Sequence, residues 1–387
     1  MNASLPLPLP GLETIVADAR RRAPEIEAAR CLPDDLAGAM ARAGVFRMLV
    51  PRAQHGLEVH PDTFIDVLAA LAHADGATGW CAMIGATTGS LASALPEAAA
   101  ERIYGSDPDL ITCGVTAPMG RAVAVDGGFR VTGRWPFGSA SRNAHWICGG
   151  CTVVDGDGET IERAPGVADV RLLMFAAADV VKHDNWHVSG LRGTGSGDIE
   201  VTDLFVPEDH GVILGSRPRV DAPLFRFPTF GLLALGVASV ALGIGRRALD
   251  ELVDLAGGKV PTGGRKPLAA RATVQVDAAR ADAGLRGARA LMRETVDQAW
   301  QAAVAGERLT TQHKADLRLA AVNATWAAVD AVDRCYHAAG GSAIYADSQL
   351  QRCFRDVHVA TQHVMVAQPV WELTGRVRLG MEVGGML

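Results

Sequence analysis

The amino-acid sequence predicts an α+β protein with three parts: an N-terminal helical domain (1–110), a central β-domain of barrel or sandwich type (111–222) and a C-terminal four-helix bundle (223–387). Two observations lead to this prediction. In the first and last parts, which are rich in alanine, apolar residues recur at the spacing of a helix buried on one face. In the middle part, short runs of β-branched and aromatic residues alternate with turn residues, as strands do.

The first part contains clear signals for the ends of helices. Pro33, followed by Asp34 and Asp35, predicts the start of a helix, and Gly44 predicts its end. The polar stretch 51–61 predicts a loop before the next helix.

Six runs in the middle part predict strands, and we expect seven or eight strands in all. The runs are Leu110–Val115, Ala122–Val125, Phe129–Thr132, Trp146–Val154, Val170–Phe175 and Ile199–Phe205. Asp126-Gly127-Gly128 predicts a hairpin turn between two of them, and the segment 155–158 predicts another turn.

In the last part, helices are expected near 230–256, 267–302, 310–338 and 347–375, separated by glycine pairs. Residues 227–245 form an uncharged run of nineteen, close to the length of about 20 that spans a bilayer. Pro228, four glycines and the amphipathic continuation of the run favour a buried helix, so we expect no membrane association.

The composition is that of a soluble globular protein, because 49% of the 387 residues are apolar and 21% are charged. The formal net charge of −6 gives no basic excess for nucleic-acid binding. The first eleven residues contain no Lys or Arg and do not resemble a signal peptide. Seven scattered cysteines indicate reduced thiols, so we expect a cytoplasmic protein.

Several common sites are excluded by their motifs. The sequence has no phosphate-binding loop, no G-x-S-x-G nucleophile elbow and no strand–GxGxxG–helix unit. Cys148 and Cys151 have CxxC spacing but no second pair, so structural thiols are favoured and no metal is expected. His358 and His363 would point about 140° apart on a helix, which disfavours a chelating pair. His363 precedes Val364-Met365-Val366, and we consider it a candidate general acid or base.

Two segments of the middle part are compatible with more than one role. Residues 135–146 place small residues and hydroxyls between aromatic side chains, a composition that suits the edge of a flat polar ring. Residues 190–197 are the richest glycine run in the chain. Each segment could equally be an ordinary connection between strands.

Five motifs in sequence resemble the acyl-CoA dehydrogenase fold, and within it the two-component flavin-dependent monooxygenases. The motifs are Ala74-Asp-Gly-Ala-Thr-Gly-Trp80, Val131-Thr-Gly-Arg-Trp-Pro-Phe-Gly-Ser-Ala-Ser141, the segment from Asp184 to Gly197 followed by Phe205-Val-Pro207, Ala339-Gly-Gly-Ser342, and Arg355-Asp-Val-His-Val-Ala-Thr-Gln-His363. The resemblance covers about residues 12 to 380.

The branch of the family follows from a missing base. Members that oxidise acyl-CoA thioesters need a carboxylate to remove a proton, commonly shortly after the Arg-Asp of the last bundle helix. Here no Asp or Glu follows Asp356 until Glu372, and none lies between Asp221 and Asp250. In the monooxygenase branch a histidine takes this place, and His363 matches it.

The resemblance implies further roles. Reduced flavin would come from a separate flavin reductase and would react with O2 to form a C4a-hydroperoxide. This hydroperoxide would hydroxylate an aromatic or hydrophobic small molecule. His363 would deprotonate the substrate, and Ser139 would accept a hydrogen bond from flavin N5–H. The remaining flavin contacts expected are Trp80, Trp135, Phe137, Gly138, Thr194 and Ser196, together with Arg265, Gln275, Gly340 and Gly341 across a subunit interface.

The resemblance also implies a homotetramer, and FAD is favoured over FMN. Alternatives stay open at this point: an acyl-CoA dehydrogenase with an unrecognised base, a flavin oxidase or N-oxygenase, and a non-catalytic scaffold. Whether His73 or His358 joins the site is also open.

Overall fold

Residues 8–100 fold mainly into helices, as expected. The computed structural model describes residues 8–383. The N-terminal helices are α1 (Leu12–Ala29), α2 (Asp34–Arg42), α3 (Pro61–Ala74), α4 (Gly76–Gly89) and α5 (Glu97–Ala100). The predicted signals around α2 are confirmed, because it begins at Asp34 and Gly44 adopts a left-handed φ of 81° just after its end.

The middle part is an open mixed sheet with two edges. Its strands are β1 (Thr112–Val125), β2 (Gly128–Trp135), β3 (Trp146–Val154), β6 (Val170–Ala176), β7 (Val181–Lys182), β8 (Ile199–Pro207) and β9 (Gly211–Ile213). They lie in the order β7-β8-β2-β1-β3-β6-β9, and β4 (Glu162–Ala164) pairs with β5 (Val167–Ala168) in a separate ribbon. The predicted barrel or sandwich is therefore wrong. The short strands β7 and β9 form the two edges of the sheet, which does not close on itself.

Both predicted turns of this part are confirmed. Val125 of β1 pairs with Gly128 of β2, so Asp126 and Gly127 form a two-residue hairpin loop. Gly127 takes a φ of 75°, which glycine adopts without steric cost. After β3, Gly158 donates to the carbonyl of Asp155 and closes the second turn.

The last part is helical, but its final predicted helix is broken. Its helices are α6 (Pro223–Arg226), α7 (Thr229–Gly258), α8 (Ala272–Val304), α9 (Thr311–Ala339), α10 (Gln349–Ala360) and α11 (Pro369–Arg378). The continuous helix predicted over 347–375 is wrong, because α10 ends at Ala360 and turns occupy the residues before Pro369. Pro369 lacks a backbone N–H and suits the first position of α11. This break carries His363.

Helix α7 is the centre of the helical part. By length and composition it is apolar enough to cross a membrane, yet 78% of its most apolar window is buried inside the protein. It packs against α3, α4, α9 and α10. The expectation of a buried helix is confirmed, and burial of its apolar side chains stabilises the fold.

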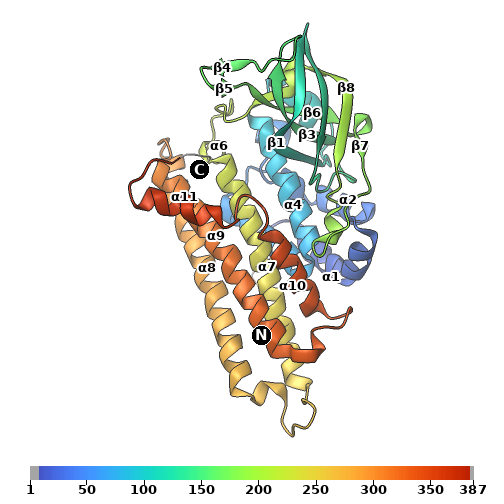
Figure 1. Ribbon diagram of the computed structural model, residues 1–387, viewed down its shortest axis with the longest axis vertical. Coiled ribbons are helices and arrows are strands. Elements are labelled where there is room, and N and C mark those ends of the chain that lie inside the picture. Colours follow the sequence, from blue (N-terminus) through green and yellow to red (C-terminus); the bar gives the residue numbers. More distant parts are fainter. Residues whose placement is uncertain (1–7, 384–387) are drawn as a thin grey trace.

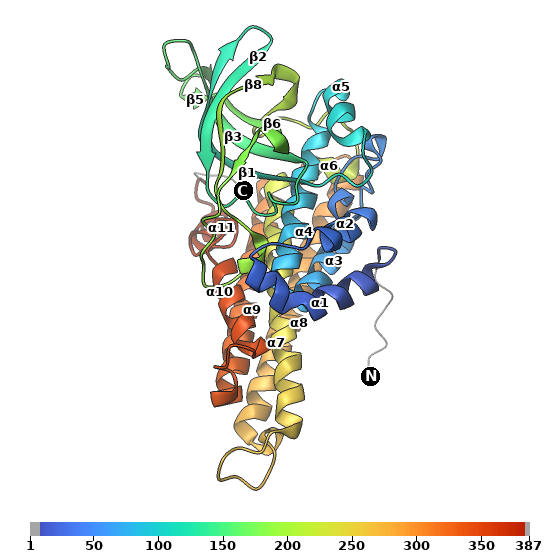
Figure 2. The ribbon, with the colours of Figure 1, turned by 90° about the vertical axis from the view of Figure 1, so that its right-hand side faces the viewer.

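Helix α4 connects the sheet to the helices. It packs against β1 on one side and against α7 on the other, and it also contacts the turn at 192–194. Figures 1 and 2 show the sheet at one end of the molecule, the long helices α7, α8 and α9 at the other, and α4 between them. Side chains from all three parts therefore meet around α4.

Candidate active site

The loop after β2 carries Ser139 in a strained conformation. Its neighbours Phe137 and Ala140 have left-handed φ values of 67° and 63°, which non-glycine residues adopt rarely and which gather at functional sites. The amide of Gly138 donates to the carbonyl of Gly197 at 3.0 Å, and a Cβ on Gly138 would lie 2.9 Å from that oxygen. Glycine is therefore required here, and it joins the Ser139 loop to the loop before β8.

Three buried hydroxyl groups form a continuous chain, called here the hydroxyl chain: Ser139, Ser196 and Thr194. The Oγ atoms of Ser139 and Ser196 are 2.6 Å apart, and Ser196 Oγ lies 2.6 Å from Thr194 Oγ1. Thr194 donates to the carbonyl oxygen of Leu191 at 2.8 Å. At the other end, the indole N–H of Trp80 donates to Ser139 Oγ at 3.2 Å.

Trp80 also connects this chain to His363. The indole of Trp80, on α4, meets the imidazole of His363 edge to face, with 5.6 Å between the ring centroids. His363 is partly buried in the turn after α10, and its Nδ1 accepts a hydrogen bond from the amide of Met365 at 3.3 Å. Since an accepting Nδ1 carries no hydrogen, the neutral ring holds its proton on Nε2.

The charge of His363 is strongly disfavoured. Burial, together with the nearby positive charge of Arg318, lowers the pKa of His363 to about 4 from an ordinary value near 6.5. Arg318 lies on α9, only 3% exposed, and burial lowers the pKa of its guanidinium as well. At pH 7 the imidazole is therefore neutral and offers Nε2–H as a donor.

Asp356 holds the far end of the hydroxyl chain in place. Its Oδ1 accepts a hydrogen bond from the amide of Leu191 at 2.6 Å, and a Cβ on Gly76 would lie 3.1 Å from its Oδ2. Burial raises the pKa of Asp356 to about 7, and the neighbouring Asp75 contributes to this rise. Asp75 is itself bonded to the amide and hydroxyl of Thr78 at the start of α4.

The structure brings together Trp80, Ser139, Thr194, Ser196 and His363 of the residues proposed from the sequence. Trp135 lies elsewhere. It is fully buried in the core of the sheet, its N–H donates to the carbonyl of Gly150 at 2.7 Å, and its ring packs on Phe175. The contact with a flavin expected for Trp135 is therefore corrected to a packing role.

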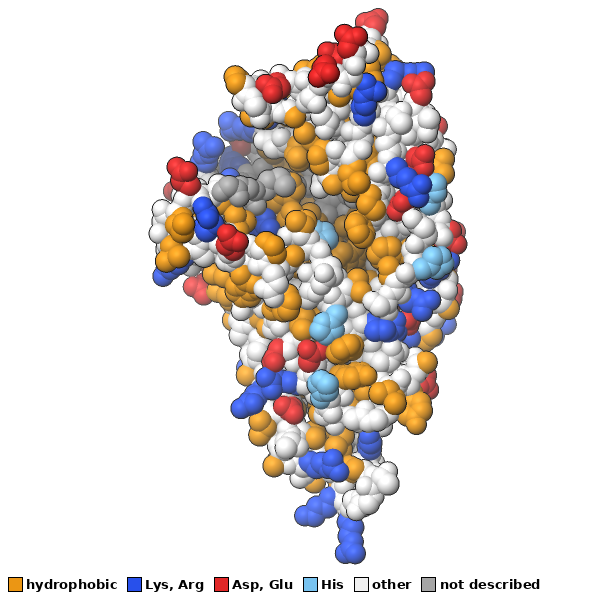
Figure 3. All heavy atoms as spheres, viewed as in Figure 1, with side chains coloured by type: hydrophobic (Ala, Val, Ile, Leu, Met, Phe, Trp, Pro, Cys, Tyr) orange, Lys and Arg blue, Asp and Glu red, His pale blue; other side chains and the backbone are white. Residues whose placement is uncertain are grey.

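An exposed aromatic pair lies beside the Ser139 loop. Phe137 is 65% exposed, and its ring meets that of Trp186 edge to face, with 6.2 Å between centroids. Trp186 in turn donates its N–H to the Leu191 carbonyl at 3.3 Å. Figure 3 shows a hollow between the sheet and the helices that is bordered by hydrophobic side chains.

The other predicted flavin contacts lie at the opposite end of the helical part. Arg265 belongs to the connection from α7 to α8, Gln275 lies in the first turn of α8, and Gly340 and Gly341 directly follow α9. Lys259 joins these two segments by donating to the carbonyl of Ala339 at 2.8 Å. Both segments are far from the sheet in Figure 1, so within one chain they do not meet Ser139.

Two other histidines left open by the sequence are engaged elsewhere. His73 lies between Arg20 and Asp250, with its Nε2 2.9 Å from the Asp250 carboxylate. His358 lies 3.0 Å from the carboxylate of Asp333. Neither contacts a residue of the hydroxyl chain through these bonds.

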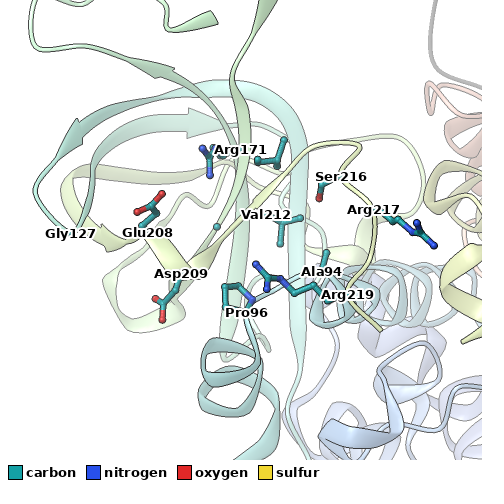
Figure 4. A pocket seen from close by; sticks show the side chains of 12 residues that line it. Ala94, Pro96, Gly127, Arg171, Glu208, Asp209, Val212, Ser216, Arg217 and Arg219 are labelled. Carbon is teal, nitrogen blue, oxygen red and sulfur yellow. The ribbon is translucent and has the colours of Figure 1, made fainter. Parts of the chain in front are cut away.

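A second depression lies beside β9 and takes in none of these residues. Figure 4 shows Arg171, Arg217 and Arg219 around it, together with Glu208 and Asp209. Arg171 is bonded to Asp169, and Asp209 to Arg102. Two of its charged residues are thus paired with groups outside the depression, and it contains none of the residues proposed from the sequence, so the hydroxyl chain and His363 form the better candidate site.

Comparison with known proteins agrees with this arrangement. The family model "Acyl-CoA dehydrogenase, C-terminal domain" matches residues 235–368. An indole-3-acetate monooxygenase of Pseudomonas putida is 34% identical over 375 residues, which cover 96% of this chain and 94% of the relative. The chain belongs to the flavin-dependent monooxygenases of the acyl-CoA dehydrogenase fold.

Two further relatives support this membership. The flavin-dependent monooxygenase oxygenase subunit HsaA of Rhodococcus jostii is 29% identical, covering 91% of this chain and 92% of the relative. The structure of XiaF from Streptomyces sp. in complex with FADH2 and glycerol superposes with a TM-score of 0.88 at 26% identity, over 97% of this chain and 98% of XiaF. The prediction of a flavin-dependent monooxygenase, and therefore of an oxidoreductase, is confirmed.

The residues of the site fit a flavin of this family. A hydroxyl oxygen has two acceptor positions, and Trp80 fills one of those of Ser139. Among the described residues no other group donates to the second position if Ser139 donates to Ser196. A buried hydroxyl beside exposed aromatic rings suits a flat heterocycle with polar ring nitrogens.

Arg318 and the Asp356–Leu191 bond were missed from the sequence. Arg318 stands among apolar residues in the segment 317–322, and this isolated charge was a usable signal for a buried functional group. No sequence signal connects Asp356 with Leu191, because the two residues are brought together only by the packing of α10 under the loop.

Asp356→Asn should make stability less dependent on pH. Asp356 has an ordinary pKa of about 3.9 in the unfolded chain and about 7 in the fold, so the native state binds its proton more tightly. This contribution is fully present below about pH 4 and is lost as the pH rises through 7. We expect the melting temperature of Asp356→Asn, relative to wild type, to be higher at pH 8 than at pH 5.

The control is Asp254→Asn, which changes an exposed carboxylate on α7. The difference in melting temperature between Asp254→Asn and wild type should be the same at pH 5 and pH 8. An equal difference at pH 5 and pH 8 for Asp356→Asn would contradict the assignment.

Proposed function

We propose that this chain is the oxygenase component of a two-component system: it takes reduced FAD from a separate flavin reductase and hydroxylates an aromatic substrate with O2. The observation that carries the proposal is the double contact of Trp80. Its N–H donates to Ser139, the proposed contact of flavin N5, and its ring packs edge to face against His363, the proposed contact of the substrate. The indole of Trp80 therefore links the part of the site proposed for the flavin to the part proposed for the substrate.

Ser139 is proposed to accept a hydrogen bond from flavin N5–H, with Phe137, Gly138, Thr194 and Ser196 around the ring. FAD is favoured over FMN because XiaF, of the same fold, is described in complex with FADH2. Arg265, Gln275, Gly340 and Gly341 lie far from the sheet in one chain, so they would meet the flavin of a neighbouring subunit. This arrangement is consistent with contact between subunits, and we propose a homotetramer, as the resemblance implies, that works in the cytoplasm.

When bound, the reduced flavin supplies the electrons that activate O2. The protein's part is to hold N5–H at Ser139, to exclude water with Trp80 and the aromatic pair Phe137 and Trp186, and to orient the substrate. His363 is proposed to orient the substrate by donating Nε2–H to a substrate oxygen. This revises the base role expected from the sequence, because a ring with a pKa of about 4 is a weak base for a phenol.

The alternative of an acyl-CoA dehydrogenase with an unrecognised base has little support from the carboxylates. Proton removal from a thioester needs a carboxylate free to take a proton. The two buried acids nearest the hydroxyl chain, Asp75 and Asp356, are both bonded to backbone amides. Their place in the fold is structural.

His363→Ala should lower the rate of hydroxylation by at least about 10²-fold, the usual cost of removing one donor from a catalytic site. The dissociation constant of reduced FAD should change little, because His363 faces the substrate side. His363→Gln retains an N–H donor and should recover part of the rate. Because the imidazole is neutral above about pH 5, the ratio of wild-type to His363→Gln rates should be constant from pH 6 to 8.

The measurement is product formation with reduced FAD supplied anaerobically before O2 is added. An unchanged rate in His363→Ala would remove His363 from the reaction. A ratio that falls steeply below pH 7 would restore the base role.

We propose further that the substrate carries a carboxylate bound by Arg318. A guanidinium is a planar donor set that matches a carboxylate, and in a buried position this interaction is strong. Arg318 is 3% exposed and close enough to His363 to lower its pKa. The relative at 34% identity is an indole-3-acetate monooxygenase, which by its name acts on an aromatic acid.

Arg318→Met should raise the KM for indole-3-acetate at least tenfold, because it removes a charge-assisted bond worth about 1.5–3 kcal/mol. The KM for indole, which lacks the carboxylate, should change less than threefold. Arg308→Met, another arginine substitution, is placed before α9 and serves as the control. Equal effects of Arg318→Met on both substrates would contradict carboxylate recognition.

A further inference from the structure

We propose that Trp80, Ser196 and Thr194 are positioning residues that fix the direction of the Ser139 hydroxyl, so that the site binds reduced flavin in preference to oxidised flavin. The inference rests on the proposed function, in which flavin N5 lies at Ser139. It goes beyond that function because it assigns a redox preference to a defined chain of hydrogen bonds.

The direction of the hydroxyl chain follows from its last bond. A carbonyl oxygen can only accept, so Thr194 must donate its single hydroxyl hydrogen to Leu191. Thr194 then accepts from Ser196 across 2.6 Å. Ser196 donates its only hydroxyl hydrogen to Thr194, so in its other 2.6 Å contact it accepts a hydrogen bond from Ser139.

The indole of Trp80 closes the chain at the opposite end. An indole N–H can only donate, so it fills one acceptor position of Ser139. Ser139 has given its hydrogen to Ser196, and its remaining capacity is one acceptor position. A ligand at Ser139 therefore meets an acceptor and needs a donor of its own.

The two redox states of a flavin differ in this respect. N5 carries a hydrogen in reduced flavin and can donate to Ser139, whereas N5 of oxidised flavin only accepts. To donate to oxidised N5, Ser139 needs its own hydrogen, so the hydrogen bonds from Ser139 to Ser196 and from Ser196 to Thr194 must both reverse their direction. Thr194 then donates to Ser196 and loses its hydrogen bond to the Leu191 carbonyl. Leu191 cannot easily move to recover this bond, because Asp356 holds its amide N–H and Trp186 donates to its carbonyl.

The expected preference is therefore that of one net hydrogen bond, about three- to tenfold. The test measures the dissociation constants of oxidised FAD and of reduced FAD for the full chain under anaerobic conditions, from the change in flavin fluorescence. Their ratio is the readout, and it does not depend on turnover.

Thr194→Val removes the acceptor for Ser196 and the bond to Leu191 at once, so Ser196 and Ser139 can reverse freely. We expect its oxidised-to-reduced ratio to fall about three- to tenfold below that of wild type. A tenfold change in this ratio corresponds to about 30 mV in the midpoint potential of a two-electron couple. The potential of the bound flavin should fall by this amount.

Two controls separate polarity from packing. Thr194→Ser keeps the hydroxyl and should keep the wild-type ratio. Thr295→Val removes a buried hydroxyl that bonds within α8 and should also leave the ratio unchanged. If Thr194→Val does not fold, Ser196→Ala interrupts the chain while leaving the bond from Thr194 to Leu191, and it should lower the ratio in the same way.

The inference would be overturned if Thr194→Val or Ser196→Ala kept the wild-type ratio of the dissociation constants of oxidised and reduced FAD. It would also be overturned if Thr194→Ser lowered that ratio as much as Thr194→Val does. Failure of the wild-type protein to bind FAD in either redox state is a different result, because it would reject the proposed function itself.

Discussion

The site depends on the position of one indole. Trp80 belongs to α4, the helix that packs on the sheet and on α7 together, and it is 7% exposed. Its N–H reaches a serine in the loop after β2, while its ring edge meets a histidine in the break after α10. Three segments far apart in the sequence are thereby fixed around a single side chain.

Buried polar groups in such a place must be bonded, and here their bonds form an ordered series. It starts at a group that can only donate, the indole N–H, and ends at a group that can only accept, the Leu191 carbonyl. Asp356 on α10 holds the amide of Leu191, and burial, together with the charge of Arg318 on α9, keeps His363 neutral. The helical part thus helps to fix the direction of the hydrogen bonds in the hydroxyl chain, and it also keeps the imidazole of His363 neutral.

The sequence predicts the order of the three parts because helical and strand periodicities differ plainly, and the resemblance to flavin monooxygenases supplies Ser139, Thr194, Ser196 and His363. It does not predict the break before Pro369, because Val364, Met365 and Val366 look like the continuation of an apolar helix face. The position of Trp135 was also missed, since the sequence does not say whether the end of β2 points to the core or to the loop.

The hydrogen bonds of the site lie beyond sequence reasoning altogether. Ser139 and Ser196 are 57 residues apart, and Leu191 and Asp356 are separated by 165. Which of them meet is decided by how α4 and α10 pack against the loops of the sheet. Their directions then follow from elementary donor and acceptor rules once the distances are known.

The most direct test of the central claim is ¹⁵N NMR of reduced FAD labelled at N5 and bound anaerobically to the protein. Donation of N5–H to Ser139 should move the N5 resonance of the wild-type complex downfield of its position in the Ser139→Ala complex. The same N5 resonance in both complexes would contradict the account.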